Sequence, residues 1–379
     1  MVAMLLSACH SQKPDDPLVP TDASTHYATL LQMQDIDDGI TLCRIMNPWQ
    51  QERVAIQYLL CETTASPENL TDHKLKEMEE HFGRFLVLDV PLQRQTLTAS
   101  CHAWLLNELE ATASIGVMCD AGYVQVPAIQ RRLDAGSILD GGKSMAPNAE
   151  VIRAIGSDAI WISPYEATSQ QIVSAQLPDI PIIYCADYME TGPLARAEWM
   201  RFYGRLVGKT DEADSLFNIV ETNYRNLACG NSGSGDLNNK PRVSVLPDLP
   251  YGATWYVAGG RSTLGQMYSD AGFHYPWTDD THGGSLALSP EAVFDKAQDA
   301  DIWLFKYNLT DHDMTLSELI GQNALYGQFH AAQTGNVFGC NTAASDYFDA
   351  TPFRPDLLLR ELKMLRQGQT DSLIYFHRL

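Results

Sequence analysis

The chain has few basic residues for its length. Of its 379 residues, 26 are Lys or Arg and 47 are Asp or Glu, which gives a formal net charge of −21. Without a basic stripe it has little to pair with phosphate groups, so we expect no nucleic-acid partner and no electrostatic adhesion to an anionic membrane surface. A run of about 18 apolar residues is also missing, so no segment is expected to span a membrane.

Motifs for catalysis and metal binding are missing as well. The sequence contains no G-x-S-x-G elbow, no H-E-x-x-H and no phosphate-binding loop, so we expect a protein that is not an enzyme and has no cofactor. Its eight cysteines include no C-x-x-C pair and no Cys/His cluster with zinc spacing, so no metal site is expected. Setting Cys9 aside leaves an odd number that cannot all pair, and most are expected to be small buried residues.

The amino terminus differs from the rest of the chain. "MVAMLLSACH" is short and apolar, and its "LSAC" at 6–9 is similar to the lipobox of bacterial lipoproteins, in which the cysteine, here Cys9, becomes lipidated after cleavage. The Pro/Asp/Ser-rich residues 10–25 that follow are typical of a tether. Because the usual basic segment is missing and the apolar run is short, either the true start lies upstream or the stretch is coincidental. We expect residues 1–9 to be a signal remnant and a lipid anchor to be the only membrane contact.

The remaining sequence divides into a β region, an α/β region, a helical region and a second α/β region. Residues 26–90 contain apolar runs between polar turns and are predicted to form strands and hairpins, an N-terminal β extension that would extend the sheet of the next region. Short apolar runs alternate with amphipathic helical patterns over 91–193 and again over 238–379, which is typical of parallel sheets flanked by helices. Residues 194–230 are predicted to be helical, and a Gly/Asn/Ser-rich linker follows them.

One unit occurs twice in the chain. "PNAEVIRAIGSDAIWIS" at 147–163 and "LSPEAVFDKAQDADIWLF" at 288–305 each combine a proline, a capping residue, a glutamate, a helical apolar pattern, an aspartate and an Ile-Trp strand. The two copies lie at matching points of the two α/β regions, so the sequence predicts two similar lobes. Trp161 and Trp303, inside the strands, are expected in the cores.

These motifs, together with "ETGPLARAEWMRFYGRLVGKTDEADSLF", "GATWYVAGGRS" and "DAGFHYPWTDD", resemble the cobalamin/iron-chelate class of ABC-transporter substrate-binding lipoproteins from about residue 90 to the end. The resemblance implies an α/β fold of two Rossmann-like lobes joined by a single long backbone helix, with the ligand in the cleft between them. It also implies a periplasmic, lipid-anchored protein whose partners are a metal chelate (cobalamin, haem or ferric siderophore) and an ABC permease dimer. The alternative is a lipoprotein of the same fold that scavenges or senses a ligand without transport.

In this class, one glutamate on each lobe docks onto arginines of the permease, and the matching residues here are Glu150 and Glu291. Asn148 and Ser289 are good N-caps, which puts both glutamates at the second helical position, free to meet a guanidinium group in a bidentate pair. The alternative is that each glutamate only complements the dipole of its helix.

Ligand-binding residues are expected in loops at the carboxyl ends of the strands, where open α/β sheets bind ligands. An aromatic-lined cleft would suit a large flat chelate, and an arginine could pair with an anionic group on it. A histidine there could be an axial metal ligand or a hydrogen-bonded wall residue. The nominated residues are His102, Tyr123, Tyr165 and Tyr188 in the first lobe, and Trp255, Arg261 and Trp277 in the second.

Overall fold

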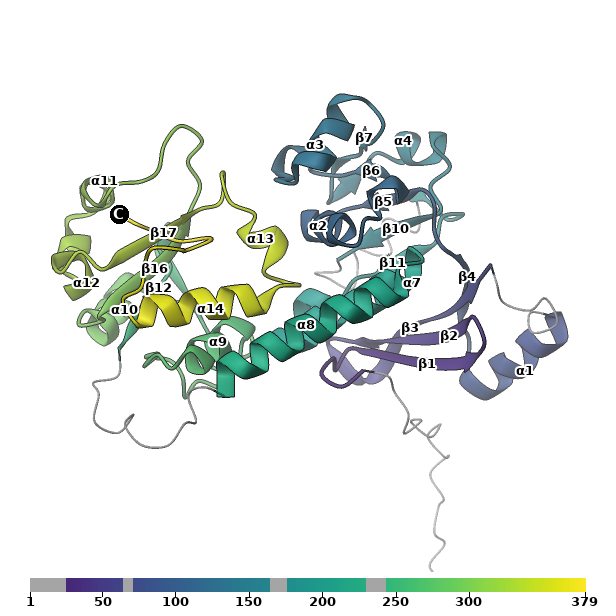
Figure 1. Ribbon diagram of the computed structural model, residues 1–379, viewed down its shortest axis with the longest axis horizontal. Coiled ribbons are helices and arrows are strands. Elements are labelled where there is room, and N and C mark those ends of the chain that lie inside the picture. The colour runs from purple at the N-terminus through teal and green to yellow at the C-terminus, as the bar shows by residue number, and fades with distance from the viewer. Residues whose placement is uncertain (1–24, 64–70, 164–175, 230–242) are drawn as a thin grey trace, which may run out of the picture.

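The computed structural model describes residues 25–63, 71–163, 176–229 and 243–379 (Figure 1). Two residues of the sequence analysis, Cys9 and Tyr165, lie outside the described residues. Within these ranges no helix has the length and apolar character needed to cross a membrane. The seven cysteines in them are all free, and five are buried, as the sequence analysis predicts.

The first lobe is built on a five-stranded parallel sheet in the order β11-β10-β5-β6-β7. Its central strands are short and buried on both faces, because helices cover the sheet on each side. The strands are β5 (Gln95–Leu97), β6 (Ile115–Met118), β7 (Leu139–Asp140), β10 (Ala159–Ile162) and β11 (Ile182–Tyr184), and the helices are α2 (Ser100–Glu108), α3 (Pro127–Asp134) and α4 (Ala149–Ala154). A small hairpin, β8 (Gly142–Lys143) and β9 (Ala146–Pro147), precedes α4.

The second lobe has a four-stranded sheet in the order β12-β16-β17-β18, parallel except for its last strand, and a three-stranded antiparallel sheet, β13-β14-β15. The strands are β12 (Val245–Pro247), β13 (Pro250–Tyr251), β14 (Thr254–Ala258), β15 (Ser285–Leu288), β16 (Ile302–Tyr307), β17 (Val337–Asn341) and β18 (His377–Arg378). The helices are α9 (Thr263–Ala271), α10 (Pro290–Ala297), α11 (Leu316–Gln322), α12 (His330–Gln333), α13 (Tyr347–Ala350) and α14 (Pro355–Arg366).

The repeated unit forms the same structure in both lobes. In each lobe a short helix, α4 or α10, leads into a strand in the interior of the sheet, β10 or β16. Trp161 and Trp303 lie in these two strands with no exposed surface, and each packs among other aromatic rings. The prediction that both tryptophans belong to the cores is therefore confirmed.

A long helix, α8 (Thr210–Cys229), connects the lobes along one side of the molecule (Figure 1). At 1.5 Å per residue, its 20 residues span about 30 Å. Its first turns pack against α6 (Pro193–Glu198) and α7 (Met200–Leu206), and its later turns pack against α9 and α14. A side chain at Gly204 would collide with Ala213, so glycine lets α7 and α8 lie in close contact.

The N-terminal strands form their own sheet, in the order β1-β2-β3-β4. The prediction of strands is correct, but the sheet does not continue that of the first lobe, and the helix between its last two strands was not predicted. The elements are β1 (Leu31–Asp37), β2 (Ile40–Asn47), β3 (Gln50–Glu62), α1 (Asp72–Phe82) and β4 (Leu86–Val90). The helix is rich in charged residues and has no fully buried side chain, although Leu75, Met78 and Phe82 pack, partly buried, against the sheet.

Buried carboxylates hold this N-terminal sheet against the first lobe. Glu198, which has no exposed surface, accepts hydrogen bonds of 2.8 Å from the backbone N–H groups of three consecutive residues, 26–28. Glu190 accepts from the backbone of Thr29 and Leu30. Because a buried carboxylate needs hydrogen-bond donors for its oxygens, these contacts fix the position of residues 26–30, which lead into β1.

The packing of α8 on both lobes leads to a prediction about ligand-induced motion. A rigid helix resists hinge closure, so the two lobes should move little when a ligand binds. Small-angle X-ray scattering of the chain with and without saturating ligand should give radii of gyration that agree within about 1 Å. A larger decrease on binding would mean that the helix bends and that the lobes close as in hinge-type proteins.

Candidate ligand-binding cleft

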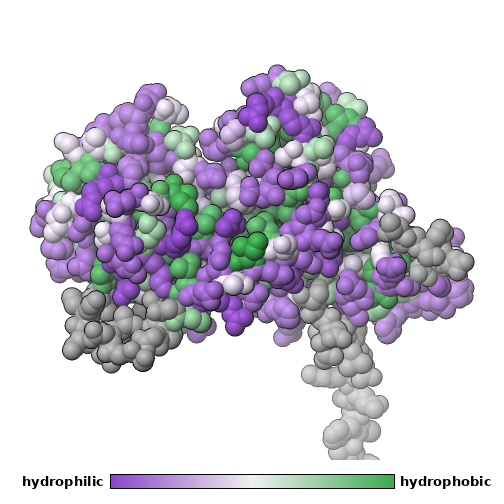
Figure 2. Space-filling view, in the orientation of Figure 1, coloured by the Kyte–Doolittle hydropathy of each residue, from purple (hydrophilic) through white to green (hydrophobic). Residues whose placement is uncertain are grey.

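A cleft of about 570 Å³ lies between the two lobes. Figure 2 shows a notch between the lobes on the face in view. The cleft is lined by segments that follow β5 and β6 in the first lobe and β16 and β17 in the second, which are the carboxyl ends of parallel strands. The lining residues are Ser100, Gly122, Tyr123, Gln125, Asn308, Thr310, Thr342, Ala343, Ser345, Phe348 and Asp349.

The short helix α13 of the second lobe closes one side of the cleft by packing against α2 of the first. Asp349 on α13 accepts hydrogen bonds from the hydroxyl of Ser100 and the backbone N–H of Gln125. Next to it, the indole Nε1 of Trp104 donates to Asp346 over 3.0 Å. Burial raises the pKa of Asp349, while the hydrogen bond from Ser100 opposes that change.

The lining of the cleft is polar and carries no cation among the described residues. Most of the lining side chains carry hydroxyl or amide groups, including the phenol of Tyr123, and Asp349 is the one carboxylate among the described lining residues. Lys143, which is not a lining residue, lies 5.7 Å from the centroid of that phenol ring and pairs with Asp120. The described lining residues can donate hydrogen bonds to and accept them from a neutral or cationic ligand, but none of them is a positive partner for a carboxylate.

Of the nominated ligand-binding residues that the structure describes, one lines this cleft. Tyr123 does so, and 67% of it is exposed. Tyr188, in a single helical turn after β11, and Arg261, before α9, are both exposed, but neither lines the cleft. Tyr165 lies outside the described residues.

Three nominated residues are corrected because their side chains are buried. His102 and Trp255 have no exposed surface, and Trp277 is 6% exposed. His102 lies in the first turn of α2, which starts at Ser100, and its side chain faces the core. Trp255 points into the core from β14, and its Nε1 donates to the carbonyl of Pro247. The adjacent Tyr256 points outward.

The polar residues of the cleft were missed by the sequence analysis. Asn308 and Thr342 each directly follow a strand of the second lobe, so the rule that located Tyr123 could have found them. Asp349 carries no such signal, because its partner Ser100 is 249 positions away.

His102 belongs to a buried charge network. Its Nε2 lies 3.1 Å from Asp187, which also accepts from the hydroxyl of Tyr203 at 2.8 Å and from Nε of Arg196 at 3.2 Å. Burial alone would raise the pKa of Asp187, but its hydrogen bonds and the charges of His102 and Arg196 lower that pKa to about 2. Asp187 is therefore charged at neutral pH and orders the residues around it.

The two predicted docking glutamates occupy equivalent places in the lobes. Both are exposed in the first turn of their helices, α4 and α10, and the side chains of Asn148 and Ser289 cap those helices. Each helix leads into a parallel strand, so it runs antiparallel to that strand and begins at the carboxyl edge of the sheet, which is the side of the cleft. The pKa of Glu291 is lowered by hydrogen bonds from its own backbone N–H and from Ser289.

Comparison with known sequences gives a family match. The sequence profile of a family described as periplasmic binding protein matches residues 113–344, which is more than half of the chain. An uncharacterized lipoprotein of Methanocaldococcus jannaschii is 28% identical over 291 residues, which cover 73% of this chain and 66% of the relative. The match thus spans just under two thirds of that relative's length.

Comparison with solved structures gives the same fold. A periplasmic haem-binding protein from Pseudomonas aeruginosa has a TM-score of 0.57 at 14% identity, covering 76% of this chain and 97% of that one. A molybdate periplasmic binding protein from Haemophilus influenzae has a TM-score of 0.57 at 16% identity, covering 73% and 86%. At these identities the likeness shows the fold alone, and it confirms the two-lobed α/β fold class predicted from the sequence.

The buried network predicts how stability depends on Asp187 and on pH. Replacing Asp187 with Asn should lower the free energy of unfolding by about 2–3 kcal/mol at pH 7, because Arg196 loses its partner. Since its pKa is depressed from 3.8 to about 2, the contribution of Asp187 is present above pH 4 and is lost as the pH falls toward 2. Urea unfolding between pH 2 and 7 measures this, with the exposed Asp38→Asn as control, expected to change stability by less than about 0.5 kcal/mol. Equal effects of the two substitutions would contradict the role of the network.

Proposed function

Since the chain belongs to the periplasmic binding protein family, we propose that it is the substrate-binding component of an ABC importer, which captures a metal chelate between its lobes and delivers it to a permease. Members of this family bind solutes and are not enzymes. The observation that carries the proposal is the cleft itself, which combines strand-end residues from both lobes in one space of about 570 Å³. This volume is within the range of about 300–1,000 Å³ that is usual for small-molecule sites.

The cleft favours one of the three chelates named by the sequence analysis. Haem carries two carboxylates, and the described lining residues include no cation to pair with them. Cobalamin is much larger than haem or a siderophore and would extend far beyond a cleft of this volume. A neutral ferric siderophore, with amide and hydroxamate oxygens on its surface, matches the hydroxyl and amide groups around Tyr123, Asn308 and Thr342.

Delivery to a permease rests on Glu150 and Glu291. Their exposure, their equivalent positions on the two lobes and their helix starts on the cleft side support a role in docking onto the two arginine-bearing halves of a permease dimer. Attachment to the outer face of a membrane would come from a lipid on Cys9 through the tether at 10–25. The lipoprotein name of the relative from Methanocaldococcus jannaschii supports that attachment.

The cleft is tested by binding measurements on one matched pair of variants. Tyr123→Ala should weaken binding of a ferric hydroxamate siderophore by about 1–3 kcal/mol, because the substitution removes an aromatic ring that would contact the ligand in the cleft. Tyr251→Ala is the control, since Tyr251 is 85% exposed on the second lobe, away from the cleft. Isothermal titration calorimetry with the siderophore, haem and cobalamin measures the affinities, and the siderophore should bind tightest. Equal losses in both variants, or tighter binding of haem, would refute this assignment.

Docking is tested by uptake in cells that carry the cognate permease. Glu150→Lys with Glu291→Lys should abolish uptake while the isolated protein binds ligand normally, because charge reversal repels the permease arginines but leaves the cleft intact. Either single Ala variant should weaken uptake, since each pair contributes about 1–3 kcal/mol. Reversal of Glu52 on β3 and Glu80 on α1, both exposed in the N-terminal region, is the control and should leave uptake unchanged. Normal uptake by the Glu150/Glu291 double variant would favour a scavenging or sensing lipoprotein instead.

A further inference from the structure

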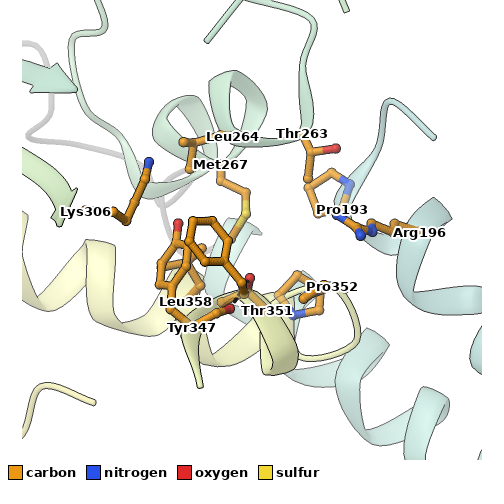
Figure 3. Close-up of a pocket in the computed structure, with 12 residues that line it drawn as sticks. Pro193, Arg196, Thr263, Leu264, Met267, Lys306, Tyr347, Thr351, Pro352 and Leu358 are labelled. Carbon is orange, nitrogen blue, oxygen red and sulfur yellow. Dashed lines mark hydrogen bonds between the residues drawn. The ribbon is translucent and has the colours of Figure 1, made fainter. Parts of the chain in front are cut away.

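A second cavity lies on the opposite face of α13 from the cleft. Its volume is about 210 Å³, and its walls come from α6 of the helical region and from α9, β16, α13 and α14 (Figure 3). The lining residues are Pro193, Arg196, Thr263, Leu264, Met267, Lys306, Tyr347, Phe348, Thr351, Pro352, Pro355 and Leu358.

The spacing of residues along α13 shows that the helix separates the two spaces. Within α13, Asp349 lines the cleft, whereas Tyr347 and the C-cap residue Thr351, which also has helical backbone angles, line the cavity. Residues four apart lie on one face of a helix and the residue midway between them lies on the opposite face, so the cleft and the cavity flank α13 on opposite faces. Phe348 lies between these faces, lines both spaces and is 59% exposed.

The two spaces differ in charge. The cleft has one carboxylate and no cation among its described lining residues, whereas the cavity has two cations, Arg196 and Lys306, and no carboxylate. The carboxylates that pair with these cations, Asp187 and Asp248, do not line the cavity, so they hold each cation from behind. Figure 3 shows Lys306 and Arg196 at opposite ends of the cavity, with Met267 and Tyr347 between them.

The walls between the two cations are apolar and aromatic. Leu264, Met267 and Leu358 supply aliphatic surface, and Tyr347 and Phe348 supply two rings. The ammonium group of Lys306 lies 5.9 Å from the ring centroid of Tyr347, so it is already placed beside aromatic surface. An inorganic anion would leave these walls uncovered, and a neutral hydrocarbon would leave the cations without a new partner.

Volume, charge and wall chemistry together define a ligand. A cavity of about 150 Å³ with apolar walls accommodates benzene, so 210 Å³ accommodates one ring with a small substituent. We propose that this cavity is a second binding site, separate from the cleft, for a single-ring aromatic carboxylate, whose ring lies against Met267 and Phe348 and whose carboxylate pairs with Lys306. The site goes beyond the proposed transport function and does not depend on which chelate the cleft binds.

The test measures binding of benzoate to the full chain by isothermal titration calorimetry, with benzyl alcohol as the uncharged ligand of similar shape. Benzoate should bind with one site per chain and at least about tenfold more tightly than benzyl alcohol, because only benzoate gains a charge-assisted hydrogen bond. Lys306→Met should weaken benzoate by about tenfold or more. Lys296→Met is the matched control, since Lys296 also lies over an aromatic ring, 5.6 Å from Trp277, but does not line the cavity.

A second variant keeps the test decisive if loss of Lys306 disturbs folding by leaving Asp248 unpaired. Leu264→Trp retains both cations and fills the cavity, so it should abolish benzoate binding while the ferric siderophore still binds the cleft. Unchanged benzoate affinity in Lys306→Met or Leu264→Trp, equal binding of benzyl alcohol, or no benzoate binding at all would overturn the proposal. Loss of benzoate binding in the presence of saturating siderophore would also overturn it, because the cavity would then hold part of the cleft ligand. Since the transport proposal is tested separately, by siderophore binding to the cleft and by uptake, failure of benzoate binding leaves it untouched.

Discussion

The packing of α8 on both lobes is the constraint on which the rest of the structure depends. Near its start the helix packs through Ala213 against α7, and near its end Tyr224 donates a 2.6 Å hydrogen bond to Asp270 on α9 while Asn223 donates to Asp356 on α14. These contacts set the separation of the lobes, and the separation in turn sets the width of the space into which the strand-end segments project. The cleft, the position of α13 within it and the cavity behind α13 all follow from that spacing.

The two-lobed architecture could be predicted from the sequence because the same helix–strand unit occurs once in each lobe. A helix followed by an Ile-Trp strand has a local pattern, and burial of Trp161 and Trp303 in interior strands of their sheets needs no information from distant residues. The strands of the N-terminal extension could also be predicted from their local pattern. The way this extension attaches to the rest of the fold could not be predicted, because it depends on Glu190 and Glu198. These glutamates lie about 160–170 positions away in a helical region, where glutamate is normally exposed.

The candidate site was much harder to predict for the same reason. Aromatic residues near strand ends were nominated as ligand contacts, but whether such a ring points into a cleft or a core depends on one residue of register. Trp255 and Tyr256 show this directly, since one is buried and its neighbour is 48% exposed. The residues that do line the cleft are mostly small and polar, a composition found in ordinary loops, and the contact of Asp349 with Ser100 joins parts of the chain that only the folded structure brings together.

The central claim is that ligand binds between the lobes, against strand-end segments of both, while α8 holds the lobes at a fixed distance. Hydrogen–deuterium exchange of the full chain with and without a saturating ferric hydroxamate siderophore tests it most directly. The account predicts slower exchange of backbone amides at 120–125, 308–310 and 342–349, with exchange in α8 unchanged. Protection confined to the N-terminal sheet or to faces away from the cleft, with those three segments unaffected, would contradict it.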